Sequence, residues 1–145
     1  MKSEYYMQFI CKEDNRFSVV IDDNSSVCYA YLIKNNNIIG DVWLYNQEPS
    51  PKFNEWEFKN EGPFLNPELY VSDEYQTKPL KEHNSVELKW GFSSTELVFV
   101  EIYFDNRLVA VITPESKPGW SIFAKKNGPL AKVLNENVLK SIKGE

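Results

Sequence analysis

"LVFVEIYFDNRLVAVIT" occupies residues 97–113, and its pattern is the strongest indication of architecture in the chain. From Val98 to Phe104, apolar residues at every second position alternate with a second set that contains Glu101. Successive side chains of a strand point to opposite faces, so this period of two predicts a strand with one buried and one partly wet face. Asp105-Asn106 separates this run from the next and predicts a two-residue turn. Residues 97–104 and 107–113 are therefore expected to form an antiparallel hairpin.

Other strand-like runs precede this hairpin. Residues 27–33 and 38–45 predict a second hairpin, because the asparagines between them tolerate the left-handed backbone of a tight turn. Shorter strands are expected over residues 5–10, 17–21 and 86–92.

The apolar period changes near the C-terminus. From Pro129 onward, apolar residues recur at helical spacing with lysines on the other side, which predicts an amphipathic helix that stops at Gly144. A short helical turn is also expected over residues 121–126. Strands dominate and helices come late, so we predict an α+β fold: a single domain, residues 1–145, with a largely antiparallel sheet built from hairpins and a C-terminal amphipathic helix.

The residue combinations of common active sites are missing from the sequence. His83 is the single histidine and lies in a polar connector, so a solvent-exposed loop residue is expected rather than a triad member. Cys11 and Cys28 lack the spacing of a zinc site and are expected to be buried, reduced thiols. The glycines are too scattered for a phosphate-binding loop. We therefore expect no enzyme activity, no metal and no cofactor.

Charge is distributed unevenly along this chain of net charge −5. Residues 41–75 carry two lysines against eight carboxylates, whereas residues 117–145 carry six lysines against two glutamates. Such asymmetry bears on partners and association rates rather than on fold. The C-terminal lysines are expected to form a solvated helix face, and the acidic balance argues against direct nucleic-acid binding.

The N-terminal sequence lacks the apolar core of a signal peptide, and the longest apolar run, residues 27–33, is too short to span a bilayer. A cytoplasmic protein without a membrane segment is therefore expected.

Residues 40–67 combine aromatic rings and carboxylates with four prolines that prevent regular structure. A long irregular connection in a compact domain is uncommon unless it is functional or disordered, and so many rings argue against disorder. Acidic groups around aromatic anchors suit a basic protein partner, because charges speed encounter and rings supply affinity. The predicted partner-binding residues are Asp41, Glu48, Phe53, Glu55, Trp56, Glu57, Phe58 and Glu61.

Three other interpretations of this composition stay open. In the first, aromatic rings of the segment line a small-molecule pocket in a ligand-binding or regulatory module. Three of the rings are expected to anchor the segment to the sheet, namely Trp43, Phe64 and Tyr70. A pair of its carboxylates would suit a glycosidase-like hydrolase if it lay at the required separation. Alternatively, the surface around Gly119-Trp120 and the C-terminal helix is the contact face, and the acidic block only keeps the protein soluble.

Three segments, GDVWLYN (40–46), EGPFLNP (61–67) and SKPGWSIFAKKNGPLAKVL (116–134), resemble a family of small bacterial proteins. The chain as a whole is similar to the immunity proteins of contact-dependent or polymorphic toxin systems. Such proteins are typically compact, cytoplasmic, single-domain and often acidic, and each neutralises a cognate toxin that is frequently a basic nuclease. The resemblance implies a protein-binding role against a basic toxin. It assigns no individual residue, so the predicted contacts depend on the charge and aromatic pattern alone.

Overall fold

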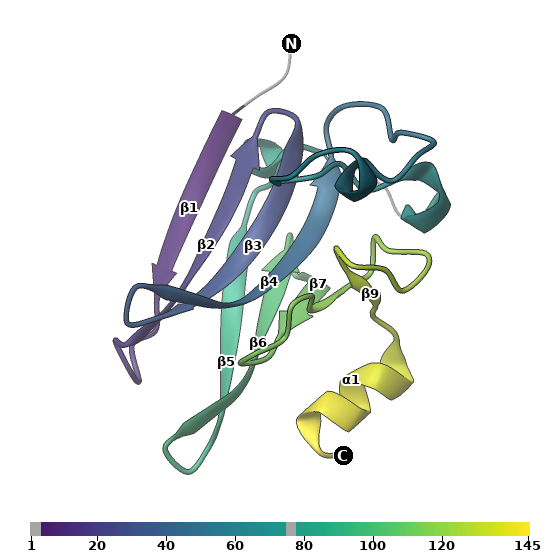
Figure 1. Cartoon of the computed structure of the whole chain (residues 1–145). Helices are drawn as coiled ribbons and strands as arrows, with labels where there is room; N and C mark the ends of the chain where they lie inside the picture. Colours follow the sequence, from purple (N-terminus) through teal and green to yellow (C-terminus); the bar gives the residue numbers. More distant parts are fainter. Residues whose placement is uncertain (1–3, 75–77) are drawn as a thin grey trace.

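The computed structural model describes residues 4–74 and 78–145, which form two sheets stacked face to face (Figure 1). The first sheet contains four antiparallel strands in chain order, β1 (Glu4–Ile10), β2 (Phe17–Asn24), β3 (Val27–Lys34) and β4 (Asn37–Asn46). The second sheet contains five strands in chain order, β5 (Val86–Ser93), β6 (Glu96–Phe104), β7 (Arg107–Ile112), β8 (Trp120–Ser121) and β9 (Lys132–Val133). The β8–β9 pair is parallel and the other pairs are antiparallel.

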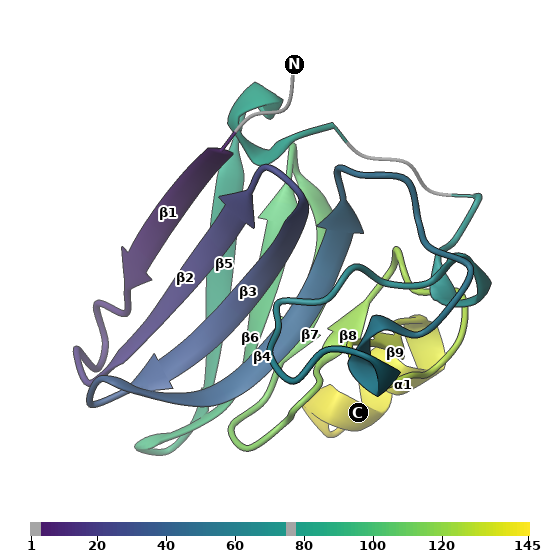
Figure 2. The same cartoon turned by 45° about the horizontal axis from the view of Figure 1, so that its top comes forward.

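Helical elements are short and lie outside the sheets. They are the 3₁₀ turns η1 (Glu55–Glu57), η2 (Glu68–Tyr70) and η3 (Leu80–Glu82), and the C-terminal helix α1 (Glu136–Lys143). The predicted α+β fold with largely antiparallel strands and a C-terminal helix is therefore confirmed, with the strands divided between two sheets. Figure 2 shows β1–β4 in front of β5–β7.

The hairpin predicted from residues 97–113 is present as β6 and β7. Asp105 and Asn106 both have positive φ, 50° and 68°, which gives the left-handed backbone that matches the twist of a two-residue hairpin. Val100, Ile102 and Phe104 are buried, as the alternation predicts.

Val98 does not follow the alternation and is 36% exposed. Its neighbours Leu97 and Phe99 pair with consecutive residues of β5, so Val98 is the extra residue of a β-bulge. The bulge turns Val98 outward, and Leu97 takes the buried position instead.

The sandwich closes along β4, whose outer edge bonds to the chain after β7. The Asp41 amide donates to the Ser116 carbonyl at 3.1 Å, and the Trp43 amide donates to the Leu130 carbonyl at 2.9 Å. Gly40 allows this approach, because a Cβ there would lie 2.6 Å from Ile112 Cγ2. The fold thereby brings residues 116–131 beside the strand that carries Asp41.

The predicted start of the C-terminal helix at Pro129 is wrong. Lys132 and Leu134 donate their amides to the carbonyls of Gly119 and Ser121, so this part of the apolar run joins the second sheet as β9. The helix begins after Asn135, whose side chain accepts from the Val138 amide at 2.9 Å. It ends at Gly144, with φ 75°, as predicted.

The helical turn predicted over residues 121–126 is also absent. Ser121 belongs to β8, and Ala124 forms an isolated bridge with Val71.

A buried ion pair fixes α1 against the outer face of the second sheet. Lys143 Nζ lies 3.2 Å from Glu101 Oε2, and the Glu101 side chain is only 4% exposed. The contact is a charge pairing rather than an aligned hydrogen bond, since that oxygen has no hydrogen-bond partner of good geometry. The expected solvated lysine face of the helix therefore needs correction, because Lys143 lies on its covered side.

We predict that Lys143→Ala lowers the free energy of unfolding by about 1–3 kcal/mol, because it leaves the Glu101 carboxylate buried without a countercharge. Lys140→Ala is the matched control, since it removes the same charge from an exposed site of the same helix. Urea unfolding measures both variants. Equal effects of the two substitutions would contradict a specific role for the pair. In the Lys143→Ala background, Glu101→Gln should recover part of the lost stability.

Candidate functional site

The residues between β4 and η2, numbers 47–67, are called here the β4 connection. It has no strands and one 3₁₀ turn, as its prolines predict. Three polar side chains nevertheless hold it in one arrangement, and those side chains are Tyr29, Asn46 and Glu55.

Asn46 joins the two ends of the β4 connection. Its Oδ1 accepts from Trp43 Nε1 at 2.9 Å and from the Asn66 amide at 3.0 Å. Its Nδ2 donates to Ser50 Oγ at 2.9 Å and to the Asn66 carbonyl at 2.8 Å. An asparagine side chain has two N–H donors and one oxygen that can accept two hydrogen bonds, so these four contacts use the full hydrogen-bonding capacity of Asn46.

Glu55 braces the middle of the connection from inside. It is 7% exposed, its Oε1 accepts from the Leu65 amide at 2.8 Å, and its Oε2 lies 3.0 Å from Lys59 Nζ. Glu55, a predicted partner contact, is therefore turned inward in this conformation. The carboxylate is occupied by the connection itself, and Tyr29 Oη adds a 2.7 Å hydrogen bond to the Phe64 carbonyl.

Phe53 and Phe58 are the outward-facing rings of the connection. They are 54% and 73% exposed, and their rings meet edge to face with centroids 5.6 Å apart. This is a favourable aromatic geometry, so each ring supports the other on the surface. Two adjacent exposed phenylalanines on a braced turn form a preorganised apolar projection.

The other predicted contact residues divide into surface and covered groups. Glu57 and Glu61 are exposed next to the projection. Trp56 is partly buried, with its ring 5.8 Å from that of Tyr70. Glu48 bonds to the Ser26 hydroxyl, and Asp41 is half-buried on β4.

The predicted anchors are confirmed. Trp43 is fully buried, and Phe64 and Tyr70 are half-buried.

We predict that Asn46→Ala lowers the free energy of unfolding by about 2–4 kcal/mol, because several partly buried partners lose their hydrogen bonds. Amide hydrogen exchange should accelerate in residues 47–67 more than in β2 and β3. Asn54→Ala is the control, since the Asn54 side chain makes a single long contact, 3.3 Å to Glu57. A uniform loss of protection across both sheets would contradict the local role assigned to Asn46.

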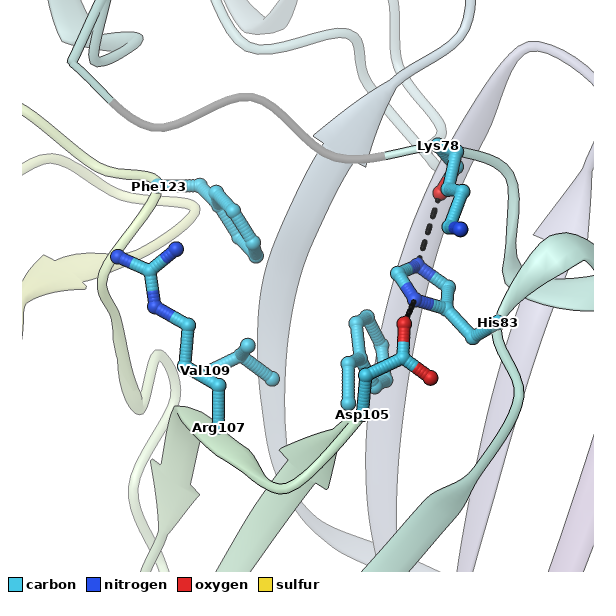
Figure 3. A pocket seen from close by; sticks show the side chains of 7 residues that line it. Lys78, His83, Asp105, Arg107, Val109 and Phe123 are labelled. Atoms are coloured by element: carbon cyan, nitrogen blue, oxygen red, sulfur yellow. Dashed lines mark hydrogen bonds and ion pairs between the residues drawn. The ribbon is translucent and has the colours of Figure 1, made fainter.

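A second candidate site is a pocket of about 510 Å³ at the turn between β6 and β7 (Figure 3). Its lining combines basic, acidic and apolar side chains, which are Lys78, His83, Phe104, Asp105, Arg107, Val109 and Phe123. His83 Nδ1 lies 2.9 Å from Asp105 Oδ2, and Nε2 lies 3.0 Å from the Lys78 carbonyl oxygen. A neutral imidazole has one N–H and can serve one of these acceptors, whereas an imidazolium serves both.

The expected exposure of His83 is wrong, since its side chain is only 6% exposed. Its ring packs against Phe104, with centroids 4.6 Å apart. No serine, threonine or cysteine occurs among the described residues that line the pocket, so His83 and Asp105 face no hydroxyl or thiol nucleophile there. Their geometry instead ties η3 to the β6–β7 turn, because Asp105 Oδ1 also accepts from the amides of Asn84 and Ser85.

Hydrogen bonding from His83, and then from the amides of Ser85 and Asn84, lowers the pKa of Asp105. A carboxyl whose pKa is lowered by folding adds stability above its unfolded pKa and loses that stability as pH falls through the lowered value. We predict that Asp105→Asn destabilises the protein at pH 7 and makes the decline of stability below about pH 4 shallower. Urea unfolding from pH 3 to 7 tests this, with Asp73→Asn as control. If the free energy of unfolding depended on pH in the same way in the wild type and in Asp105→Asn, the stabilising role assigned to the Asp105 carboxylate would be contradicted.

Lysines of the C-terminal region lie over aromatic rings rather than only in solvent. Lys132 Nζ lies 4.1 Å from the centroid of the Trp120 ring, and Lys126 Nζ lies 5.4 Å from that of Tyr70. The Lys132 contact is a cation–π pair that covers one face of the Trp120 ring. The alternative contact face there is thus partly covered by its own lysine.

Burial raises the pKa of both thiols, which are free and buried as predicted. Within residues 4–74 and 78–145, no helix is both long and apolar enough to cross a membrane. No family model, curated protein or solved structure matches this chain.

Proposed function

We propose that this protein binds a basic protein partner through the β4 connection and acts in the cytoplasm as an immunity protein that neutralises a bacterial toxin. The observation that carries the proposal is the exposed Phe53–Phe58 pair on a braced turn. Aromatic side chains dominate binding energy when a partner covers them, and a rigid turn loses little conformational entropy on binding.

Carboxylates outnumber the two exposed lysines, Lys52 and Lys59, in the connection that carries this apolar projection. The exposed acidic residues of the connection and of the chain just after it are Glu57, Glu61, Glu68, Asp73 and Glu74. Leu69, 58% exposed, is a further exposed apolar side chain and lies in η2. An apolar centre with an acidic rim suits a partner whose own surface is basic, because complementary charge speeds association and discriminates against acidic proteins.

The role of a toxin inhibitor rests on the resemblance to immunity proteins and on this charge pattern. A nuclease must hold phosphates with basic residues, so an acidic projection that enters its cleft competes directly with the nucleic acid. In this proposal Phe53 and Phe58 supply most of the binding energy. Glu57 and Glu61 speed association by electrostatic attraction, and Glu55 maintains the conformation of the turn.

The test begins with capture of the tagged protein's partner from its own cells at low and moderate salt, followed by calorimetry on the purified pair. Phe58→Ser should weaken the complex at least tenfold, since it removes an aromatic anchor. The double change Glu57→Gln and Glu61→Gln should slow association and reduce its salt dependence.

Matched controls are available on other surfaces. Ile38→Ser removes an exposed apolar side chain, 48% exposed, at the opposite end of β4. The double change Glu87→Gln and Glu96→Gln removes two exposed charges from the second sheet. If the controls weaken the complex as much as the test variants, the contact face is elsewhere. If no partner is captured, the pocket beside His83 becomes the leading site for a small-molecule function.

A further inference from the structure

A separate cavity of about 300 Å³ lies on the outer face of β3 and β4, beside the β4 connection. Its walls come from three segments distant in sequence and consist of Tyr29, Tyr31, Asp41, Gly62, Pro63, Phe64, Pro129 and Leu130. Aromatic rings and prolines thus surround a single carboxylate.

The two tyrosines form one wall of this cavity. Tyr29 and Tyr31 are two residues apart on β3, so their rings stand on the same face of the sheet. The rings are nearly parallel, at 13°, with centroids 6.1 Å apart. The Tyr29 hydroxyl bonds to the Phe64 carbonyl, which fixes the connection against this wall. The π faces of such rings are electronegative and attract cations.

Asp41 supplies the charge of the cavity. It lies directly across the strand pair from Tyr31 and is half-buried. Within residues 4–74 and 78–145, no hydrogen bond or ion pair to its carboxylate is found, although the charge of Lys117 acts on it. Burial raises the pKa of Asp41, so the ionised form is less solvated here than on an open surface.

Nearby carboxylates also act on the two tyrosines of this cavity. Burial, followed by the charges of Asp22 and Asp41, raises the pKa of Tyr31 to about 12. The pKa of Tyr29 is also raised, by burial and then by Tyr31, with smaller contributions from Asp41 and Glu55. A phenol that is hard to ionise stays neutral, so the wall keeps its π-face character throughout the physiological pH range.

We propose that this cavity receives a cationic side chain, a guanidinium or an ammonium, presented by the basic partner. This inference rests on the proposed function, which supplies the basic partner, and it adds a second contact site that contributes to specificity. Aromatic and proline walls cover the stem of an arginine or lysine, and Asp41 pairs with its charged head. An anionic ligand would meet the unpaired Asp41 carboxylate, and a neutral one would leave that carboxylate partly desolvated without compensation.

The cavity can be tested without the partner. Two-dimensional NMR on the labelled protein follows a titration with N-acetyl-arginine amide, N-acetyl-lysine amide and the neutral isostere N-acetyl-citrulline amide. The arginine or lysine probe should shift resonances of β3, β4 and residues 62–64, and the citrulline probe should bind about tenfold more weakly, because it cannot make a charge-assisted pair.

Variants locate the charge that the probe recognises. Asp41→Asn keeps the shape and should weaken the cationic probe about tenfold. Lys117→Gln removes the competing positive charge and should tighten binding. Glu87→Gln, which changes an exposed carboxylate of the second sheet outside the cavity, is the control and should have no effect. The same variants are then measured against the captured partner, where Asp41→Asn should weaken the complex and Glu87→Gln should leave it nearly unchanged.

Equal affinity for the arginine and citrulline probes would overturn the inference, as would a partner complex indifferent to Asp41→Asn. Failure of the proposed function itself would show elsewhere, in a complex indifferent to Phe58→Ser and to the Glu57 and Glu61 changes. The two failures can therefore be distinguished, because different residues are substituted in the two tests. Tyr31→Leu provides a second check on the cavity, since it removes a π face without changing charge and should also weaken the cationic probes.

Discussion

The Asn46 side chain determines whether the β4 connection has a defined shape. One amide fastens the beginning and the end of this connection to the buried Trp43 indole. The braced turn with its exposed ring pair, and the wall that residues 62–64 give to the tyrosine cavity, both depend on that closure. The defined shape of this irregular segment therefore rests on a few polar contacts, because it contains no strand and only one short 3₁₀ turn.

Apolar runs between turn residues predicted the strands, although long stretches of β3, β4 and β7 are buried on both faces. The β6–β7 hairpin followed from alternation and from two residues that accept positive φ. The C-terminal helix was misplaced because residues 129–134 satisfy a helical period and also fit beside β8. Backbone pairing with Gly119 and Ser121 decided the outcome, and local sequence does not show where those partners lie.

The candidate sites were only partly predictable for the same reason. Composition indicated the rings of the connection, but not that Glu55 would turn inward to an amide ten residues away. His83 reads as a surface residue until Asp105, from a different hairpin, is placed beside it. The sequence did not predict the tyrosine cavity, because Tyr29, Asp41 and Pro129 come together only when the sandwich closes along β4.

Closure at a single side chain makes the β4 connection an Ω-shaped module with its own internal packing. Extra residues in its most exposed part, residues 57–61, would cost little loop-closure entropy. A change in length or sequence within residues 57–61 should therefore leave the sandwich and the closure between Asn46 and Asn66 intact.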